Sequence, residues 1–298
     1  MDLALVSDYS LDDYKDLGYE NKWSTPKGIF NELISTDRVK KVKWYPFPEK
    51  LPNYPFVEIL NDIEMKNFNP NIIFYMSCGP RDDSMFNKSI FPNSKLVVDL
   101  GDEPQTKPFN KERSKNADIV LTPDRDCFNY YKSKGYNVIH TGHWADMNIF
   151  FPDEKYEEIY DVTSSMVGNR GPTVDFVIKK MGNKFINKTG LTGEENAELY
   201  NSSKIVFQKS RFNEVTRRLF EGMATKKLVI TNTLPESKRL DLFFEEDKEI
   251  VLYSNKREAV KKINYYLKNE DKRLEIAMNG YNKVKKYYTT KNIVNYIV

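Results

Sequence analysis

Cysteine and histidine are scarce in this sequence of 298 residues, which contains two of each. Two cysteines cannot build a disulfide framework, and two histidines without a cysteine cluster cannot complete a structural zinc site. No apolar run approaches the roughly 20 residues of a membrane-spanning helix, and the amino terminus is too acidic and too briefly apolar for a signal peptide. We therefore expect a cytoplasmic protein that binds no metal ion.

Signature motifs of several common enzyme classes are also missing. The sequence has no G-x-G-x-x-G after its first apolar run and no G-x-x-x-x-G-K-[ST], the fingerprints of dinucleotide binding and of P-loop NTPases. It has no G-x-S-x-G elbow and no H-E-x-x-H, the motifs of α/β-hydrolases and zinc proteases. These absences weaken the dehydrogenase, NTPase, hydrolase and zincin interpretations.

The composition is that of a globular protein, with 40% hydrophobic and 30% charged residues. Charge is unevenly distributed, because residues 1–150 hold 19 Lys or Arg against 22 Asp or Glu (net −3), and residues 151–298 hold 27 against 21 (net +6). A basic carboxyl-terminal half suits an anionic ligand such as a nucleotide or phosphate, with nucleic acid and membrane headgroups as alternatives. Lysine-rich solvated helix faces would give the same counts.

Short apolar runs alternate with longer amphipathic ones along the whole chain, a pattern typical of parallel sheets covered by helices on both faces. A first set of strands is predicted before a break at 148–154, over Asp2–Ser7, Val42–Phe47, Asn71–Met76, Lys95–Leu100, Asp118–Thr122 and Asn137–Thr141. A second set follows the break, over Asp161–Val167, Lys184–Asn187, Lys204–Phe207, Leu228–Thr231 and Glu249–Leu252. The sequence therefore predicts two doubly wound α/β units in tandem, with ligands at the carboxyl ends of the strands.

The most specific pattern lies in the second half. It comprises the segments Tyr200–Phe207, Asn213–Ala224, Leu228–Asn232, Glu249–Tyr253, Ala259–Leu267 and Arg273–Gly280. Over roughly residues 160 to 290 this pattern resembles the carboxyl-terminal domain of GT-B glycosyltransferases, most closely the "glycosyl transferases group 1" branch that includes CgeB-like proteins. The resemblance implies two Rossmann-like domains with an interdomain cleft. We expect an acceptor-side domain over 1–152, a nucleotide-sugar-binding domain over 153–280, and a terminal helix over 281–298 that crosses back to the first domain.

A helix predicted to begin near Asn213 or Glu214 would direct its free N–H groups at a donor diphosphate. The resemblance implies that Glu221 accepts hydrogen bonds from the ribose and that Arg218, three residues earlier, is a frequent family arginine. The alternative is a simple intrahelical pair of Glu221 with Arg218. The family signature has two glutamates separated by seven residues, but Asn213 occupies the first position here and Glu214 follows one residue late.

A second candidate is the loop of Gly168 and Arg170, where the resemblance places a glycine-containing donor loop. Glycine lets the backbone approach a phosphate, and Arg170 offers a bidentate contact to the diphosphate. Lys209 and Arg211 follow the strand predicted over Lys204–Phe207 and add further cations. An ordinary strand-to-helix turn would explain the same glycines.

Candidates on the acceptor side are Asp102, at the end of the fourth strand, and His143, after the sixth. Asp102 is a candidate general base, although turn capping is the alternative, and His143 is a candidate for a sugar hydroxyl or phosphate unless it is merely satisfied within its loop. Asp124 and Asp126 have the D-x-D form that binds Mn²⁺ in another glycosyltransferase fold. We interpret Asp124 as a helix cap instead.

Together these patterns predict a glycosyltransferase that moves a sugar from a UDP- or GDP-linked donor to an acceptor hydroxyl. Arg170, Lys209 and the helix start near Asn213 would stabilise the leaving diphosphate without a metal ion, and the closest families imply retention of configuration. The acceptor is open between a glycan, a small molecule and a modified nucleic acid. The alternatives are a nucleotide-sugar epimerase of the same architecture and a non-catalytic nucleotide- or nucleic-acid-binding protein, and a glycosyltransferase for modified DNA bases would combine both ideas.

Overall fold

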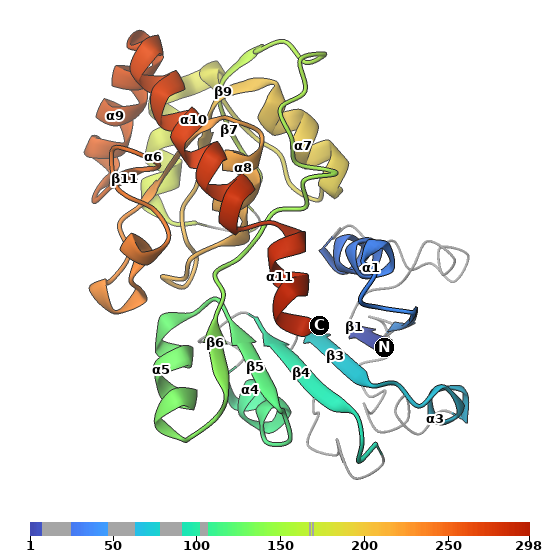
Figure 1. The fold of residues 1–298 in the computed structure, drawn as a ribbon. Coiled ribbons are helices and arrows are strands. Elements are labelled where there is room, and N and C mark those ends of the chain that lie inside the picture. The colour runs from blue at the N-terminus through green and yellow to red at the C-terminus, as the bar shows by residue number, and fades with distance from the viewer. Residues whose placement is uncertain (8–24, 47–62, 78–90, 102–106, 167, 169) are drawn as a thin grey trace. The chain divides into compact units, whose positions relative to one another are not determined.

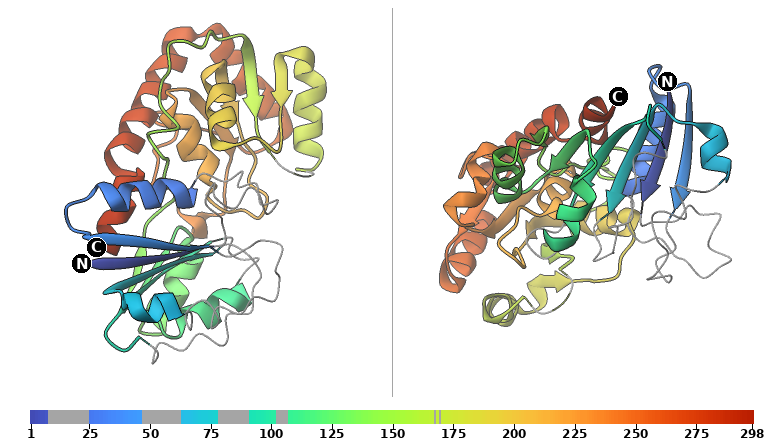
Figure 2. Two further views of the ribbon diagram at one scale, coloured as in Figure 1. Left: turned by 90° about the vertical axis from the view of Figure 1, so that its right-hand side faces the viewer. Right: turned by 90° about the horizontal axis from the view of Figure 1, so that it is seen from below.

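The computed structural model describes residues 1–7, 25–46, 63–77, 91–101, 107–166, 168 and 170–298. The chain divides into two compact units, one of residues 1–142 with 291–298 and one of residues 143–290. Each unit is built on one parallel sheet with helices packed against it (Figures 1 and 2). The prediction of two doubly wound α/β units is confirmed.

The first unit contains a six-stranded sheet in the order β2-β1-β3-β4-β5-β6. Its strands are β1 Asp2–Ser7, β2 Lys41–Pro46, β3 Ile72–Ser77, β4 Lys95–Leu100, β5 Ile119–Thr122 and β6 Val138–His140. Its helices are α1 Thr25–Ser35, α3 Ile63–Phe68, α4 Lys107–Ser114, α5 Arg125–Ser133 and α11 Thr290–Ile297. Figures 1 and 2 show α1 and α11 on the same side of this sheet. The sequence pattern also predicts a helix over 82–89, a segment that lies outside the described residues.

Two features of the first unit follow directly from its sequence. Strands β1 and β4 have the predicted bounds, since their apolar runs end at polar or glycine residues. Asp124 caps α5, because its side chain accepts a hydrogen bond from the Cys127 backbone N–H at 2.9 Å. The capping interpretation of the D-x-D segment is thus confirmed.

The second unit contains a five-stranded sheet in the order β11-β10-β9-β7-β8. Its strands are β7 Tyr160–Ser164, β8 Phe185–Asn187, β9 Ser203–Phe207, β10 Leu228–Asn232 and β11 Val251–Tyr253. Its α-helices are α6 Pro172–Met181, α7 Gly193–Asn201, α8 Arg217–Ala224, α9 Lys256–Lys268 and α10 Glu270–Tyr287. The amphipathic pattern of the sequence favours a helix over 237–244, but the segment forms two 3₁₀ turns, Glu236–Lys238 and Leu240–Leu242, because Arg239 between them takes a left-handed φ of 51°.

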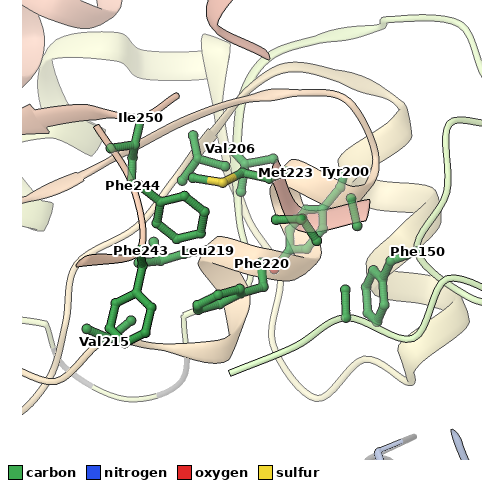
Figure 3. Close-up of a cluster of buried hydrophobic side chains, with 14 of the residues drawn as sticks. Phe150, Tyr200, Val206, Val215, Leu219, Phe220, Met223, Phe243, Phe244 and Ile250 are labelled. Atoms are coloured by element: carbon green, nitrogen blue, oxygen red, sulfur yellow. The ribbon is translucent and has the colours of Figure 1, made fainter. Parts of the chain in front are cut away.

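Both faces of the second sheet are buried. One face packs under α8 in a cluster centred on Phe220, which also holds Val206, Phe243 and Phe244 (Figure 3). The other face packs under α6 and α9. Gly222 lets α8 approach the sheet closely, since a Cβ there would lie 3.0 Å from Val206 Cγ1 and 3.1 Å from Val229 Cγ2. The close approach fixes α8, and the side chains it carries, over β9 and β10.

The boundaries between the units differ from those expected from the sequence. The chain enters the second unit at His143, not near 152, because Ala145 and Phe150 are buried in the Phe220 cluster. It returns to the first unit at Lys291, not at 281, because α10 continues to Tyr287 and buries Val284 in the same cluster.

Backbone hydrogen bonds join the segment that begins the second unit, at Ala145, to the segment that ends it, at 288–290. The Ala145 N–H donates to the Tyr288 carbonyl at 2.9 Å, and the Thr290 N–H donates to the Ala145 carbonyl at 3.1 Å. The carboxyl terminus is anchored in the first unit, where the guanidinium of Arg38 donates to the carbonyl of Val298 and to the side chain of Asn295.

Candidate functional site

The candidate site lies at the carboxyl ends of β7 and β9. The chain runs from β7 to β8 on one side and then returns to β9 on the other, so the strand order reverses between these two neighbours. Such a switch point is where doubly wound sheets bind ligands. The segment after β7 carries Gly168 and Arg170, the segment after β9 carries Lys209 through Glu214, and α8 follows.

A buried hydrogen-bond network joins the end of β7 to α7 and α8. The Oγ of Ser165 lies 2.5 Å from the hydroxyl of Tyr200 and accepts a hydrogen bond from Arg218 Nε at 3.2 Å. Ser165 is 4% exposed and Tyr200 is fully buried. Three elements thus contribute one side chain each to a polar cluster beneath the switch point.

Glu221 lies in the same region of α8 and is buried. Burial raises the pKa of its carboxyl, and the charges of Arg217 and then Arg218 act in the opposite direction. Tyr200 is close by, since burial and then the Glu221 charge raise the pKa of its hydroxyl. Arg217, the residue before Arg218, stacks over the ring of Trp144, with its guanidinium carbon 4.2 Å from the ring centroid.

Cations gather around the switch point. Arg170 is partly buried and donates from Nη1 to the carbonyl of Lys209 at 3.4 Å, and its pKa is lowered first by burial and then by the charge of Arg218. Within the described part of the chain, Lys209, Arg211 and Arg218 form no ion pair. Gly168, in the segment that also carries Arg170, is exposed and has a φ of +75°. Among the described residues, Lys209, Arg211 and Arg218 thus carry positive charge that is not held in an ion pair.

The loop before α8 differs from the prediction. The helix begins at Arg217 with Thr216 as its N-cap, not near Asn213 or Glu214. The reason is local, because the carboxylate of Glu214 accepts hydrogen bonds from the backbone N–H groups of Arg211 (3.3 Å) and Phe212 (2.6 Å). Asn213 takes a left-handed φ of 56° and is exposed. These bonds hold 210–215 as a turn and delay the helix.

The two candidates from the acceptor side have different outcomes. Asp102 lies outside the described residues. His143 is described and belongs to the second unit, where its ring packs edge-on against Phe220 at 6.2 Å. Burial, followed by the charge of Arg217, holds its pKa well below the usual value. Its Nδ1 is enclosed and has no hydrogen-bond partner among the described residues. His143 is therefore a neutral imidazole beside α8.

Sequence reasoning missed Ser165, Tyr200 and Gln208 as members of this region. Gln208 is 1% exposed, and its side-chain Nε2 finds no partner in the described structure. The alternation of side chains along β9 could have indicated Gln208. Val206 faces α8, and Gln208, two residues later, lies on the same side just beyond the end of the strand. The described residues hold no group of three or more metal-ligating side chains. Among them, no helix is long and apolar enough to span a membrane.

Comparisons with known proteins concern the carboxyl-terminal half of the chain and its fold. A family model described as glycosyl transferase-like matches residues 175–298. No curated protein matches the sequence significantly.

Three solved structures are similar over nearly the whole chain. Sucrose-phosphate synthase from Thermosynechococcus elongatus has a TM-score of 0.69 at 10% identity, covering 99% of this chain and 96% of that one. HepE from Anabaena in complex with UDP-glucose has a TM-score of 0.62 at 12% identity (99% and 98%). A putative UDP-N-acetylglucosamine 2-epimerase from Listeria monocytogenes has a TM-score of 0.61 at 11% identity (98% and 94%). The chain thus has the two-domain α/β fold of GT-B glycosyltransferase structures.

Proposed function

We propose that this protein is a glycosyltransferase that moves a sugar from a nucleotide-sugar donor to an acceptor hydroxyl. The observation that carries the proposal is the group of cations at the β7–β9 switch point, where Lys209, Arg211 and Arg218 have no ion-pair partner among the described residues. Lys209 and Arg218 are partly buried, and burying a cation costs free energy unless an anion joins it. A diphosphate is an anion of the right charge for this position.

The donor would lie with its diphosphate against these cations. Arg218 and Arg170 are the bidentate candidates, and the exposed backbone at Gly168 allows close approach. The carboxylate of Glu221 would accept hydrogen bonds from the ribose hydroxyls. The match to a glycosyl transferase-like family model supports this assignment, and the structure of HepE with UDP-glucose makes UDP the first nucleotide to test.

The cations that bind the diphosphate would also stabilise it as the leaving group of the reaction. Glycosyl transfer builds negative charge on the departing diphosphate, so cations placed there stabilise the transition state more than the ground state. Lys209 and Arg170 are proposed for this role, without a metal ion and with retention of configuration. Asp102 is retained as the proposed acceptor base. The neutral His143 would offer a hydrogen bond to a sugar hydroxyl rather than a charge.

Thermal unfolding with and without UDP, GDP and ADP tests the donor site. A nucleotide at 100 times its dissociation constant adds about 2.7 kcal/mol to the free energy of unfolding. We expect stabilisation by one diphosphate, and little stabilisation by the matching nucleoside. If no nucleoside diphosphate changes the melting temperature, the proposal is wrong.

The reaction itself is tested with the UDP-sugar or GDP-sugar of the nucleotide that binds. Release of nucleoside diphosphate in the presence of candidate acceptors would support transfer. Epimerisation of the sugar without any acceptor would instead favour an epimerase, the activity for which the similar Listeria protein is named. Binding to DNA whose affinity falls steeply with salt would favour a nucleic-acid-binding protein.

A further inference from the structure

Arg218 differs from its neighbouring cations in how it is held. Its Nε donates to Ser165 Oγ at 3.2 Å, and that hydroxyl is 2.5 Å from the hydroxyl of Tyr200. Arg218 is absent from every ion pair formed among the described residues. A guanidinium has five N–H donors in a rigid plane. Fixing its Nε therefore sets the plane of the group while the two Nη nitrogens stay available to a ligand.

The hydroxyl of Tyr200 has no packing role that a phenylalanine would not fill. The ring is buried in the Phe220 cluster and lies 6.3 Å from the ring of Phe150. Its hydroxyl is enclosed and contacts Ser165, which in turn contacts Arg218. A buried hydroxyl costs free energy unless it is hydrogen-bonded. Its partner here is the serine that orients the arginine.

The neighbouring charges explain why such an anchor is useful. Arg170 and Arg218 carry like charges near each other, and the pKa of Arg170 is lowered first by burial and then by the charge of Arg218. Glu221 attracts Arg218 toward the interior of the unit. Without a fixed Nε, the repulsion and the attraction together would favour turning the guanidinium toward Glu221 and away from Arg170.

We propose that Tyr200 and Ser165 are positioning residues that hold the guanidinium of Arg218 toward the donor diphosphate. This inference rests on the proposed function. It assigns neither residue a contact with the donor. Their effect passes through Arg218 alone.

The test is calorimetric binding of UDP and UMP, or of GDP and GMP if the wild-type protein binds the guanine nucleotide. Tyr200→Phe removes one oxygen, and we expect it to weaken diphosphate binding by about 3- to 10-fold with little change for the monophosphate. Ser165→Ala should act in the same direction. Tyr266→Phe is the matched control, because that side chain is also buried but packs in the cluster on the opposite face of the sheet, where its hydroxyl donates to Asp247 at 3.5 Å.

A double-mutant cycle separates positioning from general stability. In an Arg218→Ala background, Tyr200→Phe should change diphosphate affinity less than twofold, since the residue through which it acts is gone. Equal losses for diphosphate and monophosphate, or an undiminished loss in the Arg218→Ala background, would overturn the inference. An unchanged diphosphate affinity in Tyr200→Phe would do the same while leaving the proposed function intact. A wild-type protein that binds no nucleoside diphosphate would overturn both.

Discussion

Glu221→Gln should separate stability from nucleotide binding. Glu221 is 9% exposed, and burial raises the pKa of its carboxyl above 4.5 despite the opposing charges of Arg217 and Arg218. A carboxyl with a higher pKa in the folded chain binds more protons when folded than when unfolded. Its contribution to the free energy of unfolding is therefore fully present below pH 4.5 and is lost as the pH rises through the raised folded-state value.

A glutamine at this position resembles the protonated carboxyl and does not titrate. We predict that Glu221→Gln is at least as stable as the wild-type protein at pH 7. Between pH 4 and pH 7 its melting temperature should fall less than that of the wild type. Nucleoside diphosphate binding should nevertheless weaken by about 1.5–3 kcal/mol, the range for hydrogen bonds to charged groups. This corresponds to roughly 10- to 150-fold in dissociation constant.

Melting curves over this pH range and calorimetric titration with UDP or GDP check both halves of the prediction. The control is Glu275→Gln, an exposed carboxylate that pairs with Lys272 on α10 at 2.9 Å. It should change neither property appreciably. A Glu221→Gln variant that is clearly less stable at pH 7 but binds nucleotide normally would refute the reasoning. Glu221 would then be an intrahelical partner of the two arginines.

Three further predictions concern neighbouring residues. Arg170→Ala should lower kcat more than it raises the dissociation constant of the donor, because its contact strengthens as charge develops on the leaving group. Steady-state kinetics that show weaker donor binding with an unchanged kcat would contradict this role. Gly280→Ala should lower the melting temperature through a loss of about 1–3 kcal/mol, because a Cβ there would lie 2.6 Å from the Glu249 carbonyl oxygen. Gln208→Leu should raise the melting temperature by roughly 2–4 °C for about 1 kcal/mol, since it removes a buried amide nitrogen that has no partner among the described residues; a decrease would show that the amide is satisfied in solution.

The strands and the fold class were readily predictable from the sequence. Runs such as Leu3–Val6 and Ile205–Phe207 are fully buried on both faces of a parallel sheet, so they read as continuous apolar segments. The order of the strands, and hence the switch point between β7 and β9, comes from the structure, because periodicity does not show which strands pair. The CgeB-like branch stays a prediction.

Boundaries were harder to predict because tertiary contacts decide them. Residues 148–154 resemble a linker by composition, yet Phe150 lies in the Phe220 cluster. The start of α8 was placed too early because Glu214 is a good helix former. Its carboxylate instead satisfies two backbone N–H groups of its own loop. Periodicity does not reveal such a bond, since it depends on the turn already being formed.

The Ser210–Val215 loop connects this local geometry with the proposed chemistry. In the signature that the chain resembles, a first glutamate stands where Asn213 lies, whereas here the adjacent carboxylate of Glu214 is occupied by backbone N–H groups. Ser210 reinforces the turn, because its Oγ accepts from the Glu214 N–H at 2.7 Å and its N–H donates to the Asn232 side chain at 2.8 Å. The glutamate thus shapes the turn that joins the end of β9 to the start of α8. Donor recognition would then depend on Arg170, Lys209 and Arg218, which read a diphosphate, more than on a carboxylate that reads the transferred sugar.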